Sequence, residues 1–154
     1  MAASFIVFEG PDGAGKSTQV RRLQALYESR GVEVMIVREP GGTTVGERVR
    51  PVLLDPELTA MTVRSELLLY MASRAQLVAE VIQPALDRGV LVISDRFVYS
   101  SIVYQGMAGG LDPSEISGIG DFATNGLQPD IVFLIDIDAK QGLSRIGGDH
   151  DRME

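Results

Sequence analysis

Residues suited to binding a phosphate group stand together near the N-terminus. Gly10 is followed by four residues and then by Gly15-Lys16-Ser17, which satisfies the pattern G-x-x-x-x-G-K-[S/T]. In such a loop, backbone N–H groups surround phosphate oxygens, the lysine reaches the β- and γ-phosphates, and the hydroxyl binds Mg²⁺. The residues expected to bind the phosphates of ATP are Gly10, Pro11, Asp12, Gly13, Ala14, Gly15, Lys16, Ser17 and Thr18.

The segments on either side of this loop are those that the chemistry requires. The apolar run 5–8 precedes it and predicts a buried strand, and residues 16–30 follow with the apolar spacing of a helix. A loop in this place gains the N–H donors and the dipole of the helix N-terminus. The alternative, a chance match in a chain with 17 glycines, does not account for this context.

The rest of the chain alternates between apolar runs and helical patterns. The runs 32–37, 90–93 and 131–135 predict further strands, and the helices are expected at about 44–54, 62–88, 97–106, 113–126 and 139–146, with Pro84 interrupting or restarting the second of these. Near-continuous apolar runs are typical of parallel strands buried on both faces. We therefore predict an α/β fold with a doubly wound parallel sheet, in which ligands bind beyond the carboxyl ends of the strands.

Composition narrows the function classes. The 154 residues are enough for one domain with a hydrophobic core, and the apolar fraction of 45% is ordinary for a globular protein. The net charge of −7 argues against a polymeric nucleic acid as partner, and the lack of cysteine excludes disulfides, thiolate zinc sites and a cysteine nucleophile. No stretch resembles a signal peptide or a membrane span, so we expect a cytoplasmic protein with no membrane partner.

Charged residues follow two of the predicted strands. Arg38 leaves the second strand, where its guanidinium could hold a phosphate or could be a solvated surface arginine. Asp95 ends the third strand, as expected of a carboxylate that holds Mg²⁺ directly or through water. Arg96 beside it would bring positive charge towards transferring phosphates, and the alternative is a structural ion pair between these two neighbours.

Tyr70 and Arg74 are four residues apart in the long helix and share a face. An aromatic ring beside a planar cation could stack on a nucleobase and hydrogen-bond to its edge. A half-buried tyrosine beside an arginine with its stem along apolar surface has the same spacing, so the pattern leaves both interpretations open.

The order of these motifs resembles bacterial thymidylate kinase. The phosphate-binding loop (P-loop) is followed by Arg-Glu-Pro-Gly-Gly-Thr, Tyr-x-x-x-Arg-Ala-Gln, Asp-Arg-Phe and Tyr-Gln-Gly, and the final Asp-Arg-Met-Glu is similar to the segment after that family's lid. The resemblance implies a three-layer P-loop kinase fold with strand order 2-3-1-4-5. It also implies a cytoplasmic homodimer that transfers the γ-phosphoryl of ATP to dTMP with Mg²⁺, giving dTDP and ADP.

The resemblance also implies roles for individual residues. Arg38 and Arg96 match arginines that hold the dTMP phosphate, Tyr70 matches the aromatic that stacks on thymine, and Arg74 matches the arginine at its edge. The implied dTMP-binding residues are Asp12, Arg38, Glu39, Pro40, Tyr70, Arg74, Arg96, Ser101, Tyr104 and Gln105. The implied catalytic residues are Lys16, Arg38, Arg96 and Arg145, and the implied Mg²⁺ ligands are Ser17 and Asp95.

Two departures from the family pattern concern the C-terminal part. The lid, at about 143–151, is short and poor in arginine, and His150 in it fits a solvated residue better than a catalytic base. Some members of the family carry an arginine where Gly13 stands. Because glycine brings no charge, the lid is expected to supply it here, from Arg145 rather than from Arg152. Arg145 is also expected to bind ATP. We expect a single domain over 1–154, incomplete because the family's fifth strand lies beyond Glu154.

Three other functions fit part of the sequence. A P-loop switch or motor ATPase or GTPase would leave the candidate acceptor arginines unexplained, and no Asn-Lys-x-Asp motif for guanine is present. A nucleotide-binding protein without turnover, or a kinase for another nucleoside monophosphate, would share most of the motifs.

Overall fold

Four parallel strands form the sheet of the first of two compact units into which the chain divides. A computed structural model describes residues 4–145. Within this range, unit 1 comprises 4–38, 82–97 and 128–145, and unit 2 comprises 39–81 and 98–127. No helix among the described residues is long and apolar enough to cross a membrane.

The sheet of unit 1 has the order β2-β3-β1-β4. Its strands are β1 (Phe5–Glu9), β2 (Val34–Arg38), β3 (Leu91–Asp95) and β4 (Ile131–Leu134), and every pair is parallel. This confirms the predicted α/β class and the order of the first four strands. Because Asp95 lies opposite both Arg38 and Phe8, the strands end level with one another at their carboxyl edge.

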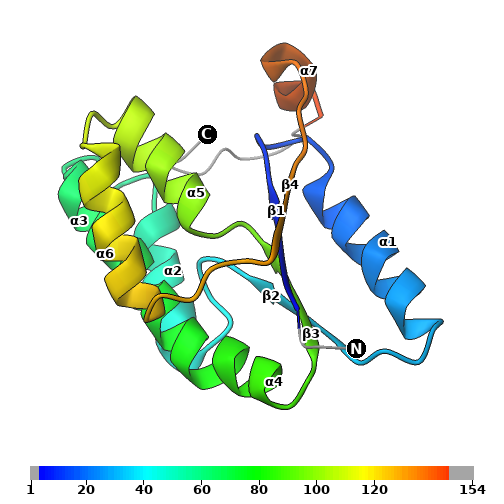
Figure 1. Ribbon diagram of the computed structural model, residues 1–154. Coiled ribbons are helices and arrows are strands. Elements are labelled where there is room, and N and C mark those ends of the chain that lie inside the picture. Colours follow the sequence, from blue (N-terminus) through cyan, green and yellow to red (C-terminus); the bar gives the residue numbers. More distant parts are fainter. Residues whose placement is uncertain (1–3, 146–154) are drawn as a thin grey trace. The chain divides into compact units, whose positions relative to one another are not determined.

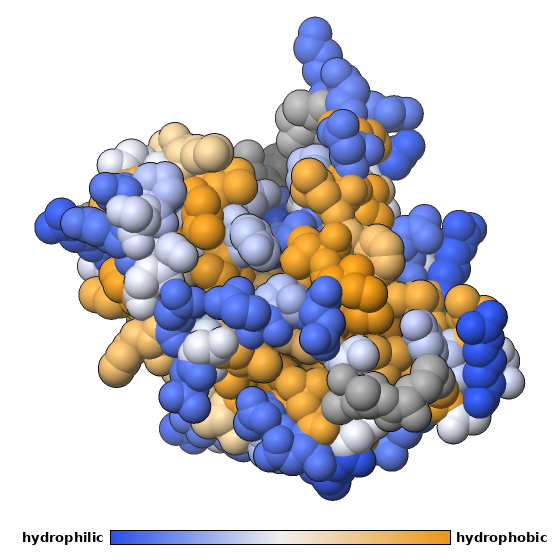
Figure 2. Space-filling view, viewed as in Figure 1, coloured by the Kyte–Doolittle hydropathy of each residue, from blue (hydrophilic) through white to orange (hydrophobic). Residues whose placement is uncertain are grey.

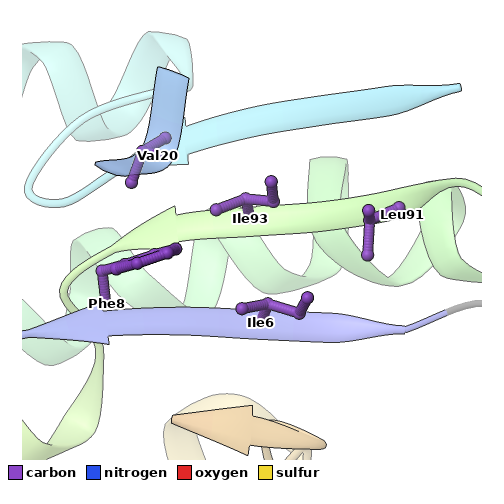
Figure 3. Close-up of a cluster of buried hydrophobic side chains, with 5 residues drawn as sticks. All are labelled: Ile6, Phe8, Val20, Leu91 and Ile93. Carbon is purple, nitrogen blue, oxygen red and sulfur yellow. The ribbon is translucent and has the colours of Figure 1, made fainter. Parts of the chain in front are cut away.

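Helix α1 (Lys16–Glu28) packs against the first three strands of this sheet (Figure 1). Its Val20 joins side chains of β1 and β3 in a buried cluster of Ile6, Phe8, Val20, Leu91 and Ile93 (Figure 3). The short helix α4 (Gln83–Asp87) also contacts β3, and α7 (Ala139–Leu143) follows β4 in the chain. The P-loop thus begins on a strand and ends on a helix that share one core.

The outer strands depart from the sequence prediction. Burial on both faces was expected for all four apolar runs, and it holds for β1, where no residue is more than 5% exposed. In β4 all four residues are exposed, from Val132 at 38% to Leu134 at 73%, and Figure 2 shows hydrophobic surface over this strand. The prediction is wrong for β4 and holds only in part for β2, where Val37 is buried but Ile36 is 38% exposed. β2 and β4 are the two edge strands, whereas β1 and β3 have neighbours on both sides.

Unit 2 is helical. It contains α2 (Thr44–Leu54), α3 (Val63–Leu77), α5 (Val98–Ser101), a π-helical segment (Ile102–Ala108) and α6 (Pro113–Thr124). Leu67, Met71 and Ile116 form a core between α3 and α6. The side chains of Thr43, Thr62 and Asp112 cap α2, α3 and α6.

The long helix predicted over 62–88 is interrupted. After α3 the chain forms a π-helical segment (Val78–Ile82), and α4 starts at Gln83 with Pro84 in its first turn. Proline has no backbone N–H and is tolerated where a helix starts, so the predicted restart at Pro84 is confirmed.

Candidate active site

The P-loop presents backbone N–H groups at the start of α1. Gly15 is the N-cap of this helix and has a left-handed conformation, with no side chain capping the first turn. In most helices a serine, threonine or aspartate occupies those N–H groups. Here they remain for an anion, as the sequence motif predicts.

Two glycines of the loop lie where a side chain has no room. A Cβ atom on Gly10, whose φ is +143°, would lie 2.5 Å from the carbonyl oxygen of Ile135. A Cβ atom on Gly13, whose φ is +72°, would overlap the carbonyl oxygen of Gly142 in α7. The loop therefore excludes an arginine at position 13 in this conformation, and extra positive charge must come from another segment.

Lys16 is buried in the loop. Its Nζ donates to the carbonyl oxygens of Gly10 at 3.0 Å and Pro11 at 2.9 Å and lies 3.7 Å from Asp12 Oδ1. Burial, and next the charge of Arg96, lower the pKa of Lys16, while nearby carboxylates act in the opposite direction. The ammonium is thus held in place by backbone oxygens, in surroundings that disfavour its charge until an anion arrives.

The two predicted Mg²⁺ ligands meet at the end of β3. Ser17 Oγ donates a hydrogen bond to Asp95 Oδ2 at 2.8 Å. A hydroxyl and a carboxylate are hard oxygen donors and fit Mg²⁺, which usually takes one or two protein ligands and completes its shell with water and substrate phosphates. No cluster of three or more His, Cys, Asp or Glu side chains suited to a metal occurs in residues 4–145.

Arg96 is paired with the P-loop. Its Nη2 lies 2.6 Å from Asp12 Oδ1, so the ion pair observed joins Arg96 to the loop. The backbone of Arg96 is left-handed, with φ of 77°, which is uncommon for a residue other than glycine and is often found at functional sites. Hydrogen bonds from its N–H to Phe8 and from Ser94 Oγ to its carbonyl oxygen hold this conformation.

Glu9 supports the same turn, and the sequence analysis missed it. It is 5% exposed, and its Oε1 accepts a hydrogen bond from the N–H of Phe97 at 2.9 Å. The signal was present, because Glu9 is an acidic residue between a buried apolar run and the P-loop. A carboxylate in that place needs a buried donor, and the backbone after Arg96 provides one.

Unit 2 gathers another group of predicted residues around Arg74. The guanidinium is only 1% exposed. It contacts Glu39 Oε2 through Nε at 2.6 Å and Nη2 at 2.5 Å, and its Nη1 donates to Ser101 Oγ at 3.2 Å. The alternative of an arginine with only its stem along apolar surface is therefore wrong for Arg74, because two of the other predicted residues, Glu39 and Ser101, contact its buried guanidinium.

A second buried contact joins the same elements. Gln105 Nε2 donates to Glu66 Oε1 at 2.5 Å, and both residues are buried. Glu66 was not predicted as a site residue, although it stands four residues before Tyr70 and eight before Arg74 on α3, a spacing that places all three on one face. Tyr70 and Tyr104 are partly buried.

Three further predicted residues are Arg38, Pro40 and Arg145. Arg38 is exposed at the end of β2, and buried Pro40 accepts a hydrogen bond from Arg50 Nη1 at 2.7 Å. Exposed Arg145 donates from Nη1 to the carbonyl oxygen of Gly13 at 3.3 Å, which joins the start of the predicted lid to the P-loop. Arg152, His150 and the rest of the lid from residue 146 lie outside the described residues.

Comparison with known proteins identifies the family. A sequence model described as thymidylate kinase matches residues 8–154. The chain belongs to the thymidylate kinase family. It is 47% identical to the thymidylate kinase of Exiguobacterium sp. and 48% identical to that of Lactobacillus delbrueckii subsp. bulgaricus, over the whole chain and 74% and 75% of those proteins.

A solved member of the family has a similar fold. The crystal structure of thymidylate kinase from Ehrlichia chaffeensis superposes with a TM-score of 0.83 at 40% sequence identity. The match covers 94% of this chain and 82% of the other. The strand order and the flanking helices described above are therefore those of a thymidylate kinase.

Proposed function

We propose that this chain transfers the γ-phosphoryl group of ATP to dTMP, giving dTDP and ADP. The observation that carries the proposal is the contact of Ser17 with Asp95 at 2.8 Å, beside a P-loop lysine, in a chain of the thymidylate kinase family. This pair supplies the two oxygen ligands that Mg²⁺ needs from the protein when it is bound with a nucleotide.

Unit 1 binds ATP and supplies charge to its phosphates. The N–H groups at the start of α1 and the ammonium of Lys16 contact the β- and γ-phosphates, and Ser17 and Asp95 would hold Mg²⁺, which when bound neutralises charge on the same phosphates. Lys16 is already directed into the loop by two carbonyl oxygens, so little reorganisation is needed when ATP binds.

Arg96 and Arg38 hold the phosphate of dTMP at the carboxyl edge of the sheet. Asp12 orients the guanidinium of Arg96 by their contact at 2.6 Å, and Arg38 ends the strand that pairs with β3 beside Asp95. The acceptor is an anionic phosphate oxygen, so no general base is required. The work of the protein is to position the two phosphates and cancel their charge.

Unit 2 binds the base and the sugar of dTMP. Arg74 donates to the edge of thymine, Tyr70 stacks on the ring, Tyr104 packs against the sugar, and Ser101 and Gln105 supply polar contacts. Glu39 and Pro40 complete this set through the loop after β2. Burial of Arg74 against Glu39 supports a preorganised site, because the guanidinium is fixed before the nucleotide binds.

A homodimer in the cytoplasm is part of the proposal. Phe122 on α6 is 89% exposed and Leu68 on α3 is 58% exposed, and large exposed apolar side chains often mark contacts with another protein. Light scattering after gel filtration tests this. Phe122→Glu should produce a monomer, whereas Leu26→Glu, at an exposed apolar residue of α1, should leave the dimer intact.

A coupled ADP-release assay with dTMP, dUMP, dCMP and AMP tests the function. Release that depends on dTMP and is faster with it than with the other acceptors supports the proposal. Bound ATP without release in the presence of any acceptor would identify a binding protein, and a preference for another monophosphate would identify a different kinase.

A further inference from the structure

Helix α7 lies against the backbone of the P-loop. A Cβ atom on Gly142 would lie 2.7 Å from the carbonyl oxygen of Asp12, and a Cβ atom on Gly13 would overlap the carbonyl oxygen of Gly142. Real Cβ atoms essentially never lie within 3.0 Å of another heavy atom, so both positions require glycine in this arrangement. We call this packing of Gly142 on Asp12 and Gly13 the glycine contact.

The backbone of Gly142 gives no reason of its own for a glycine. Its φ is not in the left-handed region, and its N–H donates to the carbonyl oxygen of Asp138 at 2.9 Å, as in any helix. Inside a helix, alanine is more favourable than glycine. The glycine at this position is therefore explained by the contact with Asp12 and not by local conformation.

The glycine contact also places Arg145. The N–H of Arg145 donates to the carbonyl oxygen of Gly142 at 3.0 Å, and its Nη1 donates to the carbonyl oxygen of Gly13 at 3.3 Å. The backbone at one end of this turn and the guanidinium at the other end thus both lie against Gly13. Movement of Gly142 away from the P-loop would carry the guanidinium with it.

We propose that Gly142 is a positioning residue, which by lacking a side chain lets α7 approach the P-loop closely enough to hold Arg145 at the γ-phosphate of ATP. The proposal rests on the proposed function, in which the P-loop binds ATP. The obstacle that a larger residue would meet is a backbone oxygen, which cannot move aside as a flexible side chain can. A displacement of about 1 Å is enough to slow a reaction that depends on the position of a charge.

Initial rates at saturating ATP and dTMP test this role. Gly142→Ala should lower kcat at least about tenfold, because Arg145 no longer reaches the transferring phosphoryl group. Titration calorimetry should show unchanged affinity for ADP and for dTMP, since neither ligand carries that group. Gln141→Ala changes an exposed neighbour in the same helix and adds no atom to the glycine contact, so it should retain wild-type kcat.

A double-mutant cycle with Arg145→Ala separates positioning from damage to the P-loop. If Gly142 acts through Arg145, Gly142→Ala should cause no further loss of kcat in the Arg145→Ala background. If the added methyl group distorts the P-loop instead, the same fold loss should appear in both backgrounds.

Cleavage by a protease that cuts after lysine tests the glycine contact without turnover. The chain has two lysines, Lys140 in α7 and Lys16, which is buried in the P-loop. Cutting requires local opening, so cleavage after Lys140, relative to the same variant unfolded in urea, should be at least about threefold faster in Gly142→Ala than in wild type. Gln141→Ala should match wild type, and cleavage after Lys16 should be unchanged in both variants.

The outcomes separate this proposal from the proposed function. Unchanged kcat in Gly142→Ala, or an equal fold loss in both backgrounds, would overturn the role of Gly142. Equally faster cleavage after Lys16 and Lys140 would overturn it as well, because the change would then be a loss of overall stability. Faster cleavage after Lys140 alone, in a chain whose wild type forms no dTDP, would contradict the proposed function and leave the glycine contact supported.

Discussion

The carboxylate of Asp12 lies 2.6 Å from the guanidinium of Arg96, although 84 positions separate the two residues in the chain. This contact joins the P-loop, which is proposed to bind the donor nucleotide, to the turn after β3, which carries the charge proposed for the acceptor phosphate. Lys16 Nζ lies 3.7 Å from the same carboxylate oxygen. Asp12 therefore orients one cation and balances another.

Replacement of Asp12 by Asn should weaken the acceptor site. The amide retains the size of the side chain but loses the charge that holds Arg96, so KM for dTMP should rise about tenfold while KM for ATP changes much less. Initial rates at varied concentrations of each substrate measure this. Asp87→Asn, at an exposed acidic residue of α4, is the control, and equal changes in both KM values for Asp12→Asn would contradict the assigned role.

The pKa of Lys16 should lie below the ordinary lysine value of 10.5, mainly because the side chain is buried. The chain has only two lysines, Lys16 and Lys140. Reductive ¹³C-methylation therefore gives few NMR signals, and Lys140→Arg assigns them. Saturation with ATP should move the Lys16 midpoint upwards, because the phosphates favour the ammonium.

The same shift predicts how stability depends on pH. Between the folded pKa of Lys16 and 10.5, the unfolded chain binds more protons than the folded one, so this residue makes stability rise with pH across that window. Below the window its contribution is constant. In urea unfolding, the free energy of unfolding of wild type should therefore rise relative to that of Lys16→Met as the pH rises towards 10.5. A fall relative to the variant would contradict the burial of Lys16.

Arg74 and Glu39 should depend on each other for stability. Arg74→Met leaves the carboxylate of Glu39 buried without its cation and should lower the free energy of unfolding by about 3–5 kcal/mol. Adding Glu39→Gln removes the stranded charge, so the double variant should be more stable than the sum of the two single changes predicts. Chemical denaturation of the four proteins measures this, and strict additivity would show that the pair is not coupled.

Arg145 should act on the transferring phosphoryl group. It reaches the carbonyl oxygen of Gly13, and position 13 itself has no room for a side chain. Arg145→Ala should lower kcat about 100-fold with little change in dTMP affinity, as expected for charge that acts in the transition state. Arg152→Ala should be measured in parallel, and wild-type kcat in both variants would leave Arg38 and Arg96 as the only arginines at the phosphates.

Local patterns were enough to select the residues proposed to bind phosphate. The P-loop is contiguous, and the rule that ligands bind at the carboxyl ends of parallel strands was enough to select Arg38, Asp95 and Arg96. The exposure of β4 was not predictable in this way, because it depends on which strand lies at the edge. Glu9 and Glu66 were missed because their hydrogen-bond partners are 88 and 39 residues away along the chain. Without knowledge of such a partner, a glutamate is expected to be exposed to solvent.

Direct detection of dTDP tests the central claim. The full chain, incubated with ATP, Mg²⁺ and dTMP, should form dTDP and ADP in equal amounts, as measured by ion-exchange chromatography. Lys16→Met should retain the folded structure in circular dichroism and form dTDP at least about 100-fold more slowly. ADP formed without dTDP, or an unchanged rate in Lys16→Met, would contradict the assignment of this chain as a P-loop kinase for dTMP.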